Sequence, residues 1–162
     1  MRWMWIDRII SLAPGEQMTA IKRISMAEDH LHDQPGGGVP IMPASLIIEG
    51  MAQTAGLLVG HANQFREKVV LAKISRAQLD AEARPGATLW YTARIVSMDD
   101  KGAATWGLVE LEEPGAERMA IGQVDLIFSH LDQAGAAGLD LPEHNFVFSE
   151  SFRTLLEMSG IR

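Results

Sequence analysis

Hydrophobic residues dominate one long stretch of the chain, from Ile41 to Val59, and the apolar pattern continues to about His61. On a helix that begins at Ala44, these residues spread around the whole circumference instead of forming one stripe. A helix that is apolar on every side is surrounded by protein. The stretch also contains Glu49, further polar residues and two glycines, which make it a poor membrane span. We therefore expect a long helix that is buried in the core.

The patterns elsewhere in the chain favour β-strands. Connections of only a few residues join the last three of them, which implies an antiparallel meander. The segment from Ala27 to Val39 has no such pattern, and we expect a loop there. The predicted strands are Gln17 to Ser25, Val69 to Leu79, Thr88 to Ser97, Ala103 to Glu112 and Met119 to Ser129.

The order of these elements is a strand, a loop, one long helix and then four strands. The simplest packing is a curved antiparallel sheet wrapped around the helix, which is an α+β fold. We assign residues 1–131 to this domain. Residues 132–162 would add a linker rich in glycine and alanine, Gln133 to Gly138, and a short amphipathic helix that packs on the same domain. Ser149 is a suitable N-cap for that helix, which would end near Met158.

Composition narrows the class of protein. The length of 162 residues and the hydrophobic share of 47% fit one globular domain. The absence of cysteine excludes disulfides, thiolate metal sites and a cysteine nucleophile. A net charge of −7 argues against a nucleic-acid binder or an anionic-membrane binder. The N-terminus reaches Asp7 and Arg8 too early for a signal peptide, so we expect a cytoplasmic protein.

Glu49 is the residue of the predicted helix that most needs an explanation. Burying an unpaired carboxylate costs several kcal/mol in practice, so this group must be neutral, paired or beside a cavity. Gln53, four residues later, shares its face of the helix. One interpretation is a carboxylate that the helix dipole stabilises and that faces water. The other is a catalytic acid or base.

The predicted loop before the helix offers further polar groups. His30 and His32 are either solvated or able to act as a base near pH 7. Three glycines, Gly36 to Gly38, form either a flexible turn or a place where free backbone N–H groups bind an anion. The histidines lack the spacing of a helical metal site, so we expect no metal.

The segment Pro40 to Gln53, PIMPASLIIEGMAQ, resembles the core motif of the FabZ/FabA-like β-hydroxyacyl-acyl carrier protein dehydratases. Trp5 to Ile9 resembles the opening of that family, and Arg84 to Gly86 resembles one of its turns. The resemblance implies a hotdog fold and a homodimer, or a higher oligomer of such dimers, with two active sites at the subunit interface. It also implies removal of water from a 3-hydroxyacyl thioester. That elimination needs a base for the proton at C2, an acid for the leaving hydroxyl and donors for the thioester oxygen.

The resemblance also implies site residues. Glu49 aligns with the catalytic carboxylate of the family, and Ala44 stands where the family has the glycine whose backbone N–H binds the thioester oxygen. Ser45 follows that position. We assign Ala44 and Ser45, together with Gln53 and Gly38, to substrate binding.

The catalytic histidine of the family is the main departure. It aligns with Pro35, inside a segment that contains an insertion, and Gln34 is the nearest aligned residue. Glutamine cannot act as a base, so we place Gln34 among the substrate-binding residues. His32, three residues before Pro35, replaces the histidine only if the glycine-rich insertion loops out. We take His32 as the second catalytic candidate.

The sequence therefore favours a dehydratase of fatty acyl or polyketide-type thioesters that are carried by acyl carrier protein or coenzyme A. We expect it to be a homodimer without a cofactor, metal, nucleic-acid partner or membrane partner. Two alternatives remain open. One is a hotdog acyl thioesterase, because a helix carboxylate and helix N-terminal amides suffice to hydrolyse a thioester. The other is a non-catalytic dimer that binds acyl chains and has lost the catalytic histidine.

Overall fold

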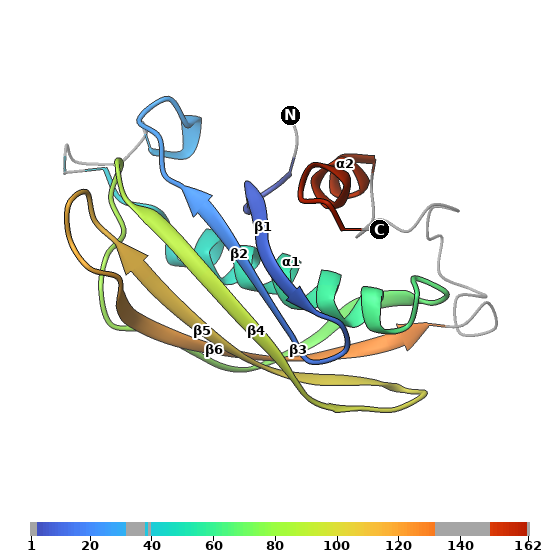
Figure 1. Cartoon of the computed structure of the whole chain (residues 1–162). Helices are drawn as coiled ribbons and strands as arrows, with labels where there is room; N and C mark the ends of the chain where they lie inside the picture. The colour runs from blue at the N-terminus through green and yellow to red at the C-terminus, as the bar shows by residue number, and fades with distance from the viewer. Residues whose placement is uncertain (1–2, 32–37, 39, 132–149, 162) are drawn as a thin grey trace.

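The structure is a computed structural model that describes residues 3–31, 38, 40–131 and 150–161. In this part of the chain, six strands form one sheet that curves around a long central helix (Figure 1). The elements are β1 (Arg8–Ala13), β2 (Gln17–Arg23), the 3-10 helix η1 (Asp29–Leu31), α1 (Ala44–Ala62), β3 (Lys68–Leu79), β4 (Thr88–Met98), β5 (Gly102–Glu112), β6 (Met119–Leu131) and α2 (Glu150–Met158).

The strands lie in the order β1-β2-β4-β5-β6-β3, and each neighbouring pair is antiparallel. The predicted meander is confirmed, because β4, β5 and β6 are consecutive in the sheet. A tight turn joins β4 to β5, where the Asp99 carboxylate accepts the backbone N–H groups of Lys101 at 2.8 Å and Gly102 at 3.0 Å. These two hydrogen bonds favour the ionised carboxylate and lower the pKa of Asp99. In the strand order given above, β1 and β3 are the two edge strands of the sheet.

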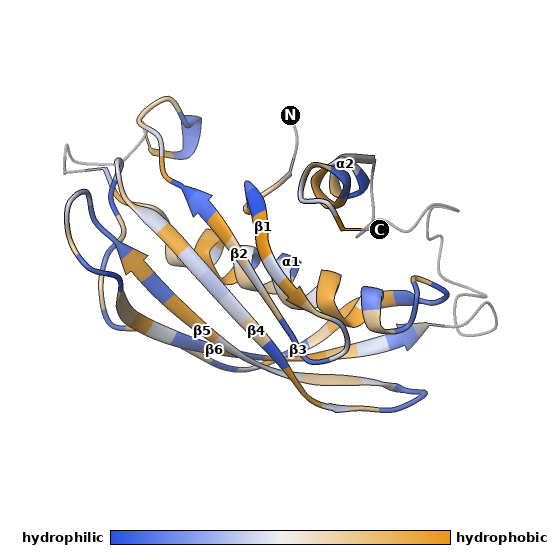
Figure 2. Cartoon of the chain, in the orientation of Figure 1, coloured by the Kyte–Doolittle hydropathy of each residue, from blue (hydrophilic) through white to orange (hydrophobic). Residues whose placement is uncertain are grey.

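Helix α1 is buried over most of its length, as its composition predicts. Every residue from Gly50 to Gly60 is buried, and apolar residues mark much of its surface in Figure 2. Two glycines permit the close approach of the helix to the sheet. A Cβ at Gly50 would lie 2.5 Å from the Tyr91 ring, and one at Gly107 on β5 would lie 2.6 Å from the Met51 sulfur. Larger residues at either place would force helix and sheet apart.

The C-terminal helix α2 packs against the edge strand β1 (Figure 1). It is amphipathic, with Phe152 and Leu155 buried and charged residues on its other side. Just after the helix, the Ser159 hydroxyl accepts the backbone N–H of Ile9 at 3.2 Å. This helix therefore covers the edge of the sheet at β1. The expected N-cap Ser149 and the linker before it lie outside the described residues.

The structure differs from the sequence prediction in two elements. The sequence predicts no strand at β1, yet Arg8–Ala13 pairs with β2. This strand is short, and apolar and polar residues do not alternate along it. Its two adjacent isoleucines differ in burial, because Ile9 is buried and Ile10 is exposed. The 3-10 helix η1 forms within the segment that the sequence predicts to be irregular. No helix among the described residues is long and apolar enough to cross a membrane.

Tyr91 is the largest side chain that the contact between α1 and the sheet buries completely. Its hydroxyl has no hydrogen-bond partner among the described residues. Burial, followed by the nearby Asp7 and Glu28 carboxylates, disfavours the phenolate and raises the pKa of Tyr91 above its usual value. The hydroxyl therefore stays protonated in the folded protein.

We predict that this tyrosine, the only one in the chain, makes the fold sensitive to alkali. Its pKa is higher in the folded state than in the unfolded state, so its contribution is complete below the unfolded pKa of about 10 and is lost as the pH rises further. The free energy of unfolding should then fall by up to about 1.4 kcal/mol per pH unit from this group alone. Denaturant unfolding at a series of pH values measures this slope.

The matched control is Tyr91→Phe, which should lack that part of the slope. At neutral pH the variant should be at least as stable as the wild type, because no hydrogen bond is lost with the hydroxyl. Tyrosinate absorbance that develops at about pH 10 in the folded protein would contradict the prediction.

Candidate active site

Glu49 lies in the second turn of α1, directly before the part of the helix that is fully buried. The residue itself is half-buried. Its Oε1 atom accepts two hydrogen bonds, one from Gln53 Nε2 at 3.0 Å and one from Trp3 Nε1 at 3.2 Å. Among the described residues, no hydrogen bond reaches Oε2. The carboxylate is therefore neither in bulk solvent nor fully paired, and one of its oxygens is available.

Gln53 joins the N-terminal segment of the chain to α1. Its Oε1 atom accepts the Trp5 backbone N–H at 2.8 Å, and its Nε2 atom donates to the Trp3 carbonyl at 3.3 Å as well as to Glu49. Gln53 is only 5% exposed, so these bonds satisfy a buried amide. The shared helix face of Glu49 and Gln53, which the sequence predicts, is thus present in the structure.

Trp5 connects this region to the 3-10 helix η1. Its ring contacts the Trp3 ring edge-to-face, with centroids 5.3 Å apart, and it contacts the His30 ring in the same way at 4.9 Å. His30 Nε2 lies 3.6 Å from Glu28 Oε2. His30 is therefore packed on the chain's own N-terminal segment and is not directed at Glu49 of the same chain.

A buried lysine connects the segments next to Trp5 and His30. Lys22 on β2 is 6% exposed, and its ammonium forms ion pairs with Glu28 and, at 3.3 Å, with Asp7. Asp7 also accepts the backbone N–H of Arg23 at 2.7 Å. A buried ammonium is stable only with such partners. These contacts hold Glu28 and Asp7, the residue before β1, against β2.

The first turn of α1 presents the second feature of the candidate site. Ala44 and Ser45 are exposed, and the N-cap residue Pro43 makes no side-chain hydrogen bond to the helix end. The first N–H groups of a helix have no acceptor within the helix and can bind an anion or a polarised oxygen. A hollow of about 280 Å³ opens beside Ala44 and Ile47, and the segment after β3 lines its other side. Glu49 points away from Ile47 on the helix and is not among the residues that line this hollow.

The remaining predicted site residues are placed only in part. Gly38 is exposed. His32 and Gln34 lie outside the described residues, as do two of the three consecutive glycines. Their roles stay predictions. The described residues contain no group of acidic residues and histidines arranged to hold a metal ion.

Two residues of the site were not predicted from the sequence. Trp3 and Trp5 are absent from the predicted site, yet the Trp3 indole N–H donates to Glu49 and the Trp5 backbone N–H donates to Gln53. Nothing in the sequence indicates that the segment returns to the start of α1.

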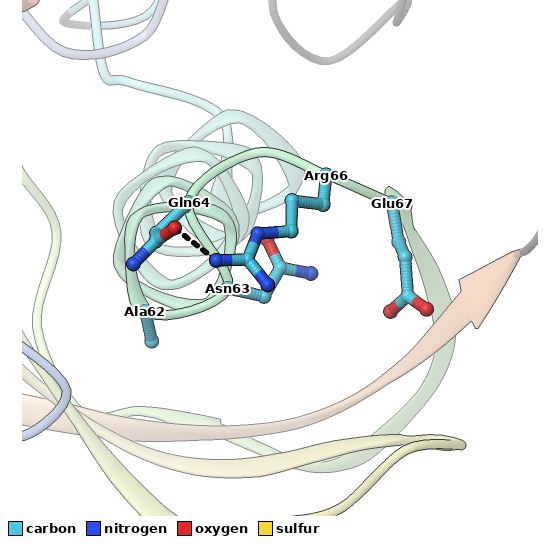
Figure 3. Close-up of a pocket in the computed structure, with 5 residues that line it drawn as sticks. All are labelled: Ala62, Asn63, Gln64, Arg66 and Glu67. Atoms are coloured by element: carbon cyan, nitrogen blue, oxygen red, sulfur yellow. Dashed lines mark hydrogen bonds between the residues drawn. The ribbon is translucent and has the colours of Figure 1, made fainter.

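A second hollow lies at the other end of α1 and is separate from this site (Figure 3). Its volume is about 330 Å³, and its lining is mostly polar. Arg66 points toward Gln64 there and donates a hydrogen bond to it. At 1.5 Å per residue, its nearest lining residue on the helix, Ala62, is about 20 Å from Glu49 along the axis. The hollow therefore offers nothing to chemistry at Glu49.

Comparisons with known proteins agree with the fold. The sequence model of the FabA-like domain matches residues 2–112. The 3-hydroxyacyl-(acyl-carrier-protein) dehydratase FabZ of Levilactobacillus brevis is 32% identical over 126 residues, which cover 77% of this chain and 81% of that protein. The same enzyme of Symbiobacterium thermophilum is 35% identical over 97 residues, which cover 59% of this chain and 68% of that protein.

Similar solved structures include a dehydratase and a thioester hydrolase. The dehydratase heterocomplex ApeI:P of Xenorhabdus doucetiae aligns with a TM-score of 0.66 at 16% identity, over 85% of this chain and 89% of that chain. An acyl-CoA hydrolase of Staphylococcus aureus, in complex with coenzyme A, aligns with a TM-score of 0.59 at 12% identity, over 74% of this chain and 66% of that chain. At such identities the alignments show the fold alone, which is the hotdog fold. With a family match over more than half of its length, the chain belongs to the FabA-like domain family.

Proposed function

We propose that this protein is a 3-hydroxyacyl-thioester dehydratase in which Glu49 is a catalytic residue. The observation that carries the proposal is the state of that carboxylate. It is half-buried near the start of a buried helix, donors hold one of its oxygens, and the other has no partner among the described residues. An acid or base needs this combination of a fixed position and a free oxygen. The FabZ relatives support the same reaction class.

The proposed reaction balances with one base and one acid. The base removes the proton at C2, the bond between C3 and oxygen breaks, and a double bond forms between C2 and C3. Glu49 delivers a proton to the leaving hydroxyl, which departs as water. The exposed N–H groups at the start of α1, at Ala44 and Ser45, stabilise the negative charge that develops on the thioester oxygen. The proton on the base then returns to Glu49 or to solvent before the next turnover.

His32 is the proposed base. The described segment before residue 32 ends at Leu31, which is buried and follows His30, whose ring packs on Trp5. Residue 32 is therefore attached to a part of the chain that is fixed beside the segment on Glu49. Gly38 and Gln34 are the proposed substrate-binding residues that accompany the two helix-terminal amides, whereas the buried Gln53 is proposed to serve substrate binding only through Glu49, to which it donates a hydrogen bond.

The proposed active unit is a homodimer that forms through β3. This strand ends the sheet and pairs only with β6 in the described chain. Every residue from Val70 to Gln78 is exposed, and Val70, Leu71 and Ile74 are apolar. A strand that is exposed on both faces and along its edge would be a site of uncontrolled pairing in a monomer. A second copy of β3, antiparallel to the first, would cover it and place the hollow beside Ala44 at the interface.

The acyl group is proposed to be carried by acyl carrier protein or coenzyme A. The FabZ relatives are named for acyl carrier protein, and a structural relative binds coenzyme A. Thioester hydrolysis is the competing reaction. It uses the same carboxylate and amides but releases a free thiol.

The first test is Glu49→Gln, which retains the shape of the side chain but replaces the acid by a neutral amide, a weaker hydrogen-bond acceptor. We expect kcat for hydration of a 2-enoyl thioester to fall about 10²–10⁴-fold, because that is the contribution of a positioned acid or base. Absorbance of the enoyl thioester measures the rate. Glu117→Gln, at an exposed residue far along the chain, is the matched control and should leave the rate unchanged. Release of free thiol by the wild type would instead show a thioesterase, and no turnover would show a binding protein.

The second test addresses the base. His32→Ala should lower kcat for the same hydration about 10²-fold or more while the protein stays folded. Unchanged turnover would exclude His32, and the proposed acid would then need another partner.

The third test addresses the dimer. Ile74→Lys on β3 should convert a dimer to monomers, because each copy would then bury an unpaired ammonium group in the proposed interface. Val96→Lys is the matched control, since Val96 is also an exposed apolar strand residue, at 68% exposure, but lies on β4. Sedimentation measures the mass of each protein. A dimeric I74K variant, or a monomeric wild type, would contradict the proposed interface.

A further inference from the structure

Trp3 is a large apolar residue that the fold leaves 57% exposed. Burial therefore does not explain its position. Its indole N–H instead donates to Glu49 Oε1 at 3.2 Å, across 46 residues of sequence. Because indole nitrogen is only a donor, Oε1 is the acceptor, and it can accept whether or not Oε2 carries a proton.

The N-terminal segment is fastened in a way that determines where the indole lies. Gln53 binds the backbone on both sides of Met4, through the Trp3 carbonyl at 3.3 Å and the Trp5 N–H at 2.8 Å. The Trp3 ring then rests on the Trp5 ring, and the Trp5 ring rests on His30. The buried Gln53 side chain thus has two roles: it holds the segment that carries Trp3, and it is itself the second donor to Glu49.

Both donors meet the same oxygen of the carboxylate. Trp3 Nε1 and Gln53 Nε2 converge on Oε1, and no hydrogen bond reaches Oε2 from the described residues. Two donors that come from different directions restrict rotation of the carboxylate about its last bond. The plane of the group is then fixed, and Oε2 is the oxygen that can exchange a proton with a substrate.

We propose that Trp3 is a positioning residue for Glu49. Its indole N–H orients the carboxylate through Oε1 and leaves Oε2 to act on the thioester. The proposal rests on the proposed function of Glu49 and adds the N-terminal segment to the catalytic apparatus. Trp3 does not exchange a proton itself.

The chain contains a matched interaction that serves as an internal control. Trp90 Nε1 donates to Glu112 Oε2 at 2.7 Å between β4 and β5. Trp90 lies between the buried residues Leu89 and Tyr91 on its strand, so its side chain points to the other face of the sheet, away from α1. Replacing Trp90 removes the same kind of bond without touching Glu49.

The experiment compares Trp3→Phe with Trp90→Phe. We expect Trp3→Phe to lower kcat for enoyl-thioester hydration about tenfold with little change in KM, because the carboxylate is retained but less well oriented. Trp90→Phe should leave both constants unchanged. A KM effect without a kcat effect, or equal effects of the two variants, would overturn the proposal.

A spectroscopic readout tests the hydrogen bond independently of activity. The four tryptophans give four indole N–H signals in a nitrogen-correlated NMR spectrum, and Trp3→Phe identifies one of them by its loss. Glu49→Gln should move that signal and leave the Trp90 signal in place, whereas Glu112→Gln should do the reverse. A Trp3 signal that does not respond to Glu49→Gln would overturn the proposal even if the enzyme is active. An inactive wild type with a responsive signal would instead overturn the proposed function, and the catalytic role of Trp3 with it, while confirming the hydrogen bond.

Discussion

The structure depends on the burial of one helix inside a curved sheet. From Gly50 to Gly60 every residue of α1 is buried, so the helix cannot exist without protein on all sides. The sheet meets this requirement by curving, and Gly50 and Gly107 let the two elements come within contact distance of Tyr91 and Met51. Glu49 is the last residue before this buried stretch. The same burial that stabilises the fold therefore sets a carboxylate at the boundary between core and solvent, where its surroundings are partly apolar but still accessible.

The surroundings of that carboxylate come from segments that are far apart in the sequence. The N-terminal residues Trp3 and Trp5 return to the start of α1, and Gln53 binds them there. The 3-10 helix reaches the same place through His30, and Lys22 connects that helix to the first strand through Glu28 and Asp7. Each contact is modest in energy, but together they tie three segments around one side chain. Such an arrangement gives the carboxylate fewer orientations than a surface glutamate on an isolated helix has.

The sequence predicts the parts of this structure that depend on local pattern. The bounds of α1 and of β3 to β6 follow from apolar periodicity and from short turns, and the motif from Pro40 to Gln53 marks Glu49 directly. The strand β1 was missed because an edge strand that contacts both the core and α2 has apolar residues on both faces. The contact between Trp3 and Glu49 was missed for a different reason. It spans 46 residues, and no local pattern encodes which side chain of a folded-back segment meets which turn of a helix. Where the family has its catalytic histidine, this sequence has Pro35 with Gln34 beside it, and neither side chain is a base, so the sequence leaves the base open.

The two ends of the sheet are treated differently, and this asymmetry limits how copies of the chain can associate. At β1, α2 lies over the edge, and Ser159 occupies the N–H of Ile9. At β3, nothing in the described chain covers the edge. A sheet that is open at both ends could add copies without limit and grow into a fibre, whereas a sheet that is blocked at one end closes after a single addition. The short C-terminal helix would thus prevent further copies from adding at β1. A protein cut before residue 150 would lose that protection against aggregation.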